Sequence, residues 1–81
     1  MGAADLRNAF NAVANPAFTC TLATLHYVQA HDVESQVLTF SGTAQDGTSF
    51  TISSDPLRAH TDVNLASADV AQALLKRTPA P

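Results

Sequence analysis

Large apolar residues alternate with serine and threonine on both sides of Gln45-Asp46-Gly47. An Asp-Gly pair between two alternating segments predicts a β-hairpin, because Gly47 can adopt the positive φ that the turn requires. Successive side chains of a strand point to opposite faces, so the pattern predicts an apolar face formed by Leu38, Phe40, Phe50 and Ile52. The opposite face is expected to be rich in hydroxyl groups and uncharged, since it carries Thr39, Ser41, Thr43, Ser49, Thr51 and Ser53.

A second apolar pattern, with helical spacing, precedes this hairpin. Leu6, Phe10 and Val13 recur on one side of residues 3–14, which predicts an amphipathic helix. We expect this helix to end at Asn15-Pro16, because proline disfavours the helical conformation of the residue before it. Three large apolar side chains do not stabilise so short a helix by themselves, so the helix is expected to pack on a sheet.

The segment that begins at Phe18 is typical of a strand, but its alternation changes phase. Cys20 and Leu22 share one parity, whereas Leu25 and Tyr27 fall on the other. We expect either a β-bulge near Ala23-Thr24 or a twisted strand that is covered on both sides.

The rest of the sheet is predicted from turn residues and alternation. Residues 31–35 are expected to connect the first strand to the hairpin, whose strands span residues 37–44 and 49–53. Asp55-Pro56 should end the third strand, and residues 61–65 predict either a short fourth strand or an extended lead-in to the last helix.

The C-terminal pattern predicts a second helix. Ser67 is a suitable N-cap, and Asp69 would then lie in the first turn, where the helix dipole favours an anion. Val70 and Leu74 belong to the apolar stripe, and Lys76-Arg77 is suited to the last turn.

Together these segments predict an α+β fold. We expect a two-layer sandwich in which an antiparallel meander of three or four strands carries both helices on one face. The prediction is a single domain over residues 1–77, with a flexible tail over residues 78–81. The other face of the sheet would then be open to water or to a partner.

Composition excludes several classes of protein. The 81 residues are 46% hydrophobic, which is too apolar for a disordered chain. The lone Cys20 rules out an internal disulfide framework and favours an intracellular protein over a covalent dimer. No stretch is apolar enough to span a membrane and no signal peptide is evident, so we expect a cytoplasmic protein without membrane contact. Four basic residues against seven acidic ones, for a net charge of −3, argue against direct nucleic-acid binding.

The residues that can carry chemistry are few and poorly spaced for it. His26 and His31 are four residues apart, and Cys20 stands alone, so neither a metal site nor a cofactor is predicted. Cys20 shares the parity of apolar neighbours and is expected to be a buried structural thiol rather than a nucleophile. We therefore expect a protein that is not an enzyme, although a small metal-dependent or thiol-dependent enzyme stays open as an alternative.

A surface for binding a protein partner is the more suggestive feature. The uncharged hydroxyl face lacks the lysines and glutamates that protect sheets against association. Tyr27, if its parity turns it outward, is the best single anchor, and acidic residues in loops would meet a basic surface of a nucleic-acid-binding complex. The predicted partner-binding residues are Tyr27, Asp32, Glu34, Asp46, Asp62, Thr39, Ser41 and Thr51.

The hairpin Phe40-x-Gly42-Thr43-x-x-Asp46-Gly47-x-x-Phe50, with its flanking helices, small size and negative charge, resembles the small phage- and prophage-encoded α/β proteins of the anti-CRISPR type. The resemblance implies an inhibitor that docks on a bacterial defence complex of the CRISPR-Cas type and blocks DNA access or nuclease recruitment. It carries over no individual functional residue. The alternative is a structural or self-associating subunit of a larger phage or secretion assembly, and the chain itself is expected to be a monomer or a weak homodimer.

Overall fold

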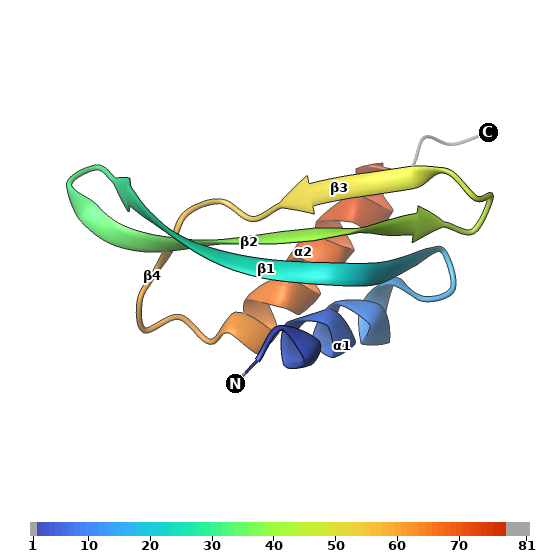
Figure 1. Cartoon of the computed structure of the whole chain (residues 1–81), viewed down its shortest axis with the longest axis horizontal. Coiled ribbons are helices and arrows are strands. Elements are labelled where there is room, and N and C mark those ends of the chain that lie inside the picture. The colour runs from blue at the N-terminus through green and yellow to red at the C-terminus, as the bar shows by residue number, and fades with distance from the viewer. Residues whose placement is uncertain (1, 78–81) are drawn as a thin grey trace.

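The computed structural model describes residues 2–77 and shows two helices and an antiparallel sheet (Figure 1). The elements are α1 (Ala3–Ala14), β1 (Phe18–Ala30), β2 (Val33–Ala44), β3 (Ser49–Ser53), β4 (Leu57–Arg58) and α2 (Val63–Arg77). The strand order is β1-β2-β3, and the short β4 pairs with β2 beyond the end of β3. The predicted α+β class, with one helix before and one after an antiparallel meander, is confirmed.

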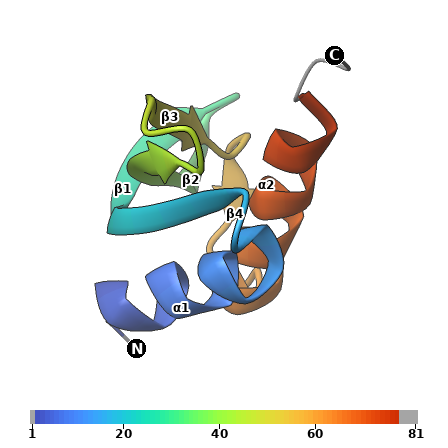
Figure 2. The same cartoon turned by 90° about the vertical axis from the view of Figure 1, so that its right-hand side faces the viewer.

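Both helices pack on the same face of the sheet, so the molecule has two layers (Figure 2). The predicted hairpin face supplies the centre of the core, where Leu38 and Phe40 are fully buried. The ring of Phe10 from α1 stacks on Phe40 and Phe50, with centroid distances of 4.7 Å and 5.8 Å. Stacked aromatic pairs of this kind stabilise by about 0.5–1.5 kcal/mol beyond the area that they bury. The sheet layer and α1 are therefore joined mainly through aromatic side chains.

The predicted bulge in β1 exists, but it lies two to three residues earlier than the expected Ala23-Thr24. The register shifts between Cys20 and Leu22, so that Thr21 is the extra residue. Before the bulge Cys20 faces the helices, and after it Ala23 and Leu25 face them. Leu22 consequently points to the open face of the sheet, where it is 58% exposed.

The connection between β1 and β2 is shorter than the predicted five residues. His31 and Asp32 alone form the turn, with φ values of 52° and 62°. Two successive positive φ values are the geometry of a type I′ hairpin turn, whose twist matches that of the flanking strands. Residues 33–35 therefore belong to β2, and the hairpin arm is longer than expected.

The prediction of a fourth strand over residues 61–65 was wrong. The fourth strand is β4, which pairs with Ser35 and Gln36 of β2. Residues 63–65 instead form the first turn of α2. The alternation of polar and apolar residues at 61–65 is thus a cap followed by helix, not a strand.

The helix α2 begins four residues before the predicted N-cap, Ser67. Asp62 is the residue that caps it: its Oδ1 accepts hydrogen bonds from the backbone N–H groups of Asn64 (3.0 Å) and Leu65 (3.2 Å). Ser67 is fully buried inside the helix, and its hydroxyl donates to the carbonyl of Val63 at 2.7 Å. Asp69 accordingly lies beyond the first turn.

The end of α2 agrees with the sequence. Lys76 and Arg77 lie in the last turn, where positive charge is favoured. The predicted flexible tail, residues 78–81, lies outside the described residues. Among residues 2–77, neither helix has the length and hydropathy that crossing a bilayer would require.

Candidate functional site

The helices leave the other face of the sheet uncovered, and this surface is called the open face (Figure 2). Three of the predicted partner-binding residues lie together on it. Ser41 is the direct cross-strand partner of Thr51, and Thr39 lies two residues from Ser41 along β2. The hydroxyls of Thr39 and Ser53 are hydrogen-bonded at 2.9 Å. The predicted hydroxyl-rich face is therefore a continuous patch across β2 and β3.

The half of the open face toward the β1–β2 turn carries apolar side chains that the sequence pattern did not bring together. The register places Val28, Val33 and Val37 there, next to His26, whereas Leu22 pairs with Ser41 in the hydroxyl-rich half. The position of the bulge decides the side of Leu22, because a one-residue shift exchanges the two faces of a strand. Val33 and Val37 lie on β2, where the period of two places them with Thr39 and Ser41. Among the described strands, the pairing places one charged side chain on this face, that of Arg58.

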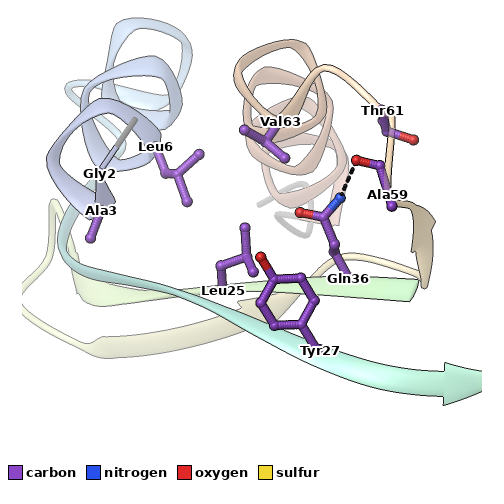
Figure 3. Close-up of a pocket in the computed structure, with 9 residues that line it drawn as sticks. All are labelled: Gly2, Ala3, Leu6, Leu25, Tyr27, Gln36, Ala59, Thr61 and Val63. Carbon is purple, nitrogen blue, oxygen red and sulfur yellow. Dashed lines mark hydrogen bonds between the residues drawn. The ribbon is translucent and has the colours of Figure 1, made fainter. Parts of the chain in front are cut away.

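Tyr27 lies on the helix-bearing side and not on the open face. It pairs with Gln36 and is 70% exposed, because β1 extends past the N-terminal end of α1. Its ring stands beside Leu25 at the mouth of a hollow of about 330 Å³ between the N-terminal ends of α1 and α2 (Figure 3). Tyr27 is therefore exposed to a partner, as expected, but from the helix-bearing side of the sheet and not from the open face.

Gln36 forms part of the floor of this hollow and joins it to the chain after β4. Gln36 is only 6% exposed, and Nε2 donates to the carbonyl of Ala59 at 3.0 Å (Figure 3). The same Nε2 donates to the carbonyl of Arg58 at 3.3 Å. A buried amide with these partners is satisfied and holds the connection to α2 in place. Gln36 is thus a structural residue beside Tyr27.

The four predicted acidic residues do not form one surface. Asp32 and Glu34 lie at the β1–β2 turn, whereas Asp46 lies at the β2–β3 turn, at the other end of the molecule (Figure 1). Asp62 is the N-cap of α2. Only the first two acids are neighbours.

The carboxylate of Asp46 is hydrogen-bonded within its own turn, the β2–β3 turn. Its Oδ1 accepts hydrogen bonds from the Thr48 hydroxyl at 2.7 Å and from the Thr48 backbone N–H at 3.0 Å. These bonds favour the ionised carboxylate, so the Thr48 hydroxyl first and its N–H second lower the pKa of Asp46. This acid has a local role in the turn.

The candidate nucleophile Cys20 is buried, as the sequence predicted. Its side chain is 2% exposed, and Sγ lies 3.2 Å from the carbonyl oxygen of Leu22. Burial raises the pKa of the thiol, which disfavours the reactive thiolate. Within residues 2–77, no three His, Cys, Asp or Glu side chains gather in a group that could hold a metal ion.

Comparison of the chain with protein families, with curated proteins and with solved structures gave no match.

Proposed function

We propose that the protein is a non-catalytic binding module that docks on a protein partner through its open face. The observation that carries this proposal is the uncovered side of the sheet, where hydroxyl groups adjoin exposed apolar side chains such as that of Leu22. Such a surface pairs hydrogen-bonding groups with apolar area, and Arg58 is the one charged side chain that the pairing of the described strands places on it. It suits a partner that presents a flat surface.

The β1–β2 turn makes one end of the proposed docking surface acidic. Asp32 and Glu34 are both exposed; Asp32 lies in the turn at the end of the open face, and Glu34, next to it in β2, points to the helix-bearing side. A basic patch on the partner would be attracted there, mainly through a faster association rate. The proposal therefore keeps these two acids from the predicted set and assigns Asp46 and Asp62 to the fold.

The specific form of the proposal is an inhibitor of an RNA-guided bacterial defence complex of the CRISPR-Cas type, acting in the cytoplasm by occupying surface. This form rests on the resemblance in size, charge and architecture to anti-CRISPR proteins. Occupying surface requires no catalytic group, so a domain whose candidate thiol is buried is compatible with it.

The test is target-DNA binding by purified complexes of this type, measured by fluorescence anisotropy with and without the protein. We expect dose-dependent loss of DNA binding or of cleavage. Thr51→Lys combined with Ser41→Lys should abolish this effect, because two buried unpaired charges oppose docking. Gln72→Lys, at an exposed position of α2, is the matched control and should leave it intact.

Two results would contradict the proposal. Inhibition that survives the double substitution on the open face would exclude this face as the docking surface. If no complex of this class is inhibited, but capture from lysate yields a partner whose binding requires Ser41 and Thr51, the binding module stands and the inhibitor form is wrong.

A further inference from the structure

The outer edge of β1 carries backbone groups that β2 does not use. Leu25 pairs with Leu38, and both backbone groups of Leu38 are directed the other way: its carbonyl accepts from Ser54 N–H at 2.8 Å and its N–H donates to Ser54 Oγ at 3.0 Å. Directly opposite residues of an antiparallel ladder either exchange two backbone hydrogen bonds or both point their N–H and C=O groups away from each other. Leu25 and Leu38 form a pair of the second kind. The N–H and C=O of Leu25 therefore face outward. Because the direction of these backbone groups alternates along a strand, those of Tyr27 and Gln29 face outward as well.

The protein covers this edge at one point only within the described residues. The carboxamide of Asn11 accepts from Cys20 N–H at 2.7 Å and donates to the Cys20 carbonyl at 3.0 Å. The side chain thus takes the place of a neighbouring strand at Cys20. Beyond it, β1 is the end strand of the sheet and continues past the N-terminal end of α1 (Figure 1).

The uncovered part lacks the usual protection against pairing. Natural edge strands are blunted by charged residues, proline or short length, whereas β1 has 13 residues and none of them is Lys, Arg, Asp, Glu or Pro. The bulge at Thr21 lies outside the segment from Leu25 to Gln29. An exposed aromatic ring, Tyr27, stands directly beside this segment.

We propose that this edge pairs antiparallel with the same edge of a second copy of the chain, about a two-fold axis near His26. In this register Leu25 of one copy lies opposite Tyr27 of the other, and the two outward-facing residues exchange both backbone hydrogen bonds. The two sheets become continuous. An edge without Lys, Arg, Asp or Glu is suited to pairing with itself, because a two-fold axis would place any such charge near the axis opposite its own copy.

The charged residues outside the paired segment are also consistent with a second copy of the chain as the partner. The register brings the β1–β2 turn of each copy, with Asp32, to the end of β1 where Cys20 of the other copy lies. Arg7 is at that end: it is four residues before Asn11 on α1 and therefore on the same side of the helix. Burial raises the pKa of the Cys20 thiol, and the nearby guanidinium of Arg7 opposes part of that rise. The register therefore brings the acidic turn of one copy toward the end of β1 near which Arg7 of the other copy lies.

The experiment is sedimentation equilibrium of the full chain over a wide concentration range. We expect a reversible monomer–dimer equilibrium for the natural sequence. Tyr27→Lys should weaken the dimer by about tenfold or more, because like charges meet beside the axis. Gln72→Lys is the matched control: Gln72 is exposed on α2, beyond the turn that borders the hollow beside Tyr27, and its replacement should leave the equilibrium unchanged.

A backbone variant tests the hydrogen bonds separately from the side chains. Gln29→Pro removes an N–H that points away from β2 and should weaken the dimer, whereas Gln29→Ala should not. Circular dichroism establishes that each variant is folded. A strictly monomeric natural chain at millimolar concentration would overturn the proposal, as would a dimer that Ser41→Lys breaks and Tyr27→Lys leaves intact. The first result would not bear on docking of a different protein through the open face, whereas the second would show that the open face itself binds a second copy.

Discussion

Gly42 occupies the most restrictive position of the sheet at the scale of single residues. It pairs with Cys20 at the bulge, and a Cβ atom added there would overlap the carbonyl oxygen of Thr19. The same atom would lie 2.9 Å from the Thr19 carbonyl carbon and 3.0 Å from Cys20 Cα. All three neighbours are backbone atoms, so no side chain can move aside. The close approach of β1 to β2 requires glycine.

We expect Gly42→Ala to lower the free energy of unfolding by about 1–3 kcal/mol, the range for overpacking in a close-packed interior. Urea denaturation monitored by circular dichroism measures it. Gly2→Ala is the control, because nothing lies within 4 Å of the added methyl group and only a small loss of capping preference is expected. Equal stability of the two variants would contradict the close approach.

The Asp46–Thr48 contact makes a prediction about pH. Hydrogen bonds from Thr48 lower the folded-state pKa of Asp46 below its usual value. A depressed carboxyl pKa contributes stability that is present above the unfolded-state pKa and is lost as pH falls through the folded-state pKa. Thr48→Val should therefore raise the pKa of Asp46 toward its usual value, as measured by NMR titration of its carboxyl carbon. Thr51→Val, on the open face, should leave that pKa unchanged.

At the scale of elements, the central hairpin was predictable and the start of α2 was not. The Asp-Gly turn and the alternation around it are local signals, so the bounds of β3, the positive φ of Gly47 and the buried face followed directly. The N-cap was missed because Asp62 and Ser67 are both capping residues. Only the burial of Ser67, which depends on tertiary packing, separates them.

In the candidate site, too, some features follow from local sequence signals and others depend on the tertiary structure. The gathering of Thr39, Ser41 and Thr51 on one face could be predicted, since it depends only on the period of two. The side on which Leu22 lies depends on the position of one extra residue in β1, and the sequence indicated the shift without its place. Tyr27 lies on the helix-bearing side for a bulge at either position. The two-residue strand β4 carries no periodic signal at all, because its existence depends on pairing with β2.

Two substitutions separate the two possible caps of α2. Asp62→Ala removes the acceptor of two helix N–H groups and should lower the free energy of unfolding by about 0.5–2 kcal/mol. Ser67→Ala should change it by less than about 1 kcal/mol, because alanine favours the helix interior and the Val63 carbonyl keeps its place in the helix. Thermal and urea denaturation measure both. A larger loss for Ser67→Ala would contradict the assigned start of the helix.

At the scale of the whole molecule, the two layers enclose the thiol of Cys20 between the sheet and α1. The side chain belongs to the same core as Phe10 and Phe40. A reagent therefore reaches it only when this part of the molecule opens.

We expect Cys20 to react slowly with a thiol reagent such as DTNB in native buffer and to form no disulfide-linked dimer on mild oxidation. The rate should rise steeply through the urea unfolding transition. A variant that carries Ser53→Cys in a Cys20→Ser background supplies an exposed thiol for comparison, since Ser53 lies on the open face. Equal rates for the two proteins in native buffer would show that the layers do not enclose Cys20.

The bulge at Thr21 also sets where the chain tolerates a change of length. Cys20 and Leu22 pair with consecutive residues of β2, so removing Thr21 would join them into a regular ladder in which every later side chain keeps its face. Removing Thr24 instead would move Leu22 and Ala23 to the wrong faces. We expect a chain without Thr21 to fold and a chain without Thr24 to lose its sharp NMR spectrum. Thr21 is thus the point in β1 at which the spacing of the chain can change while the sheet keeps its two sides.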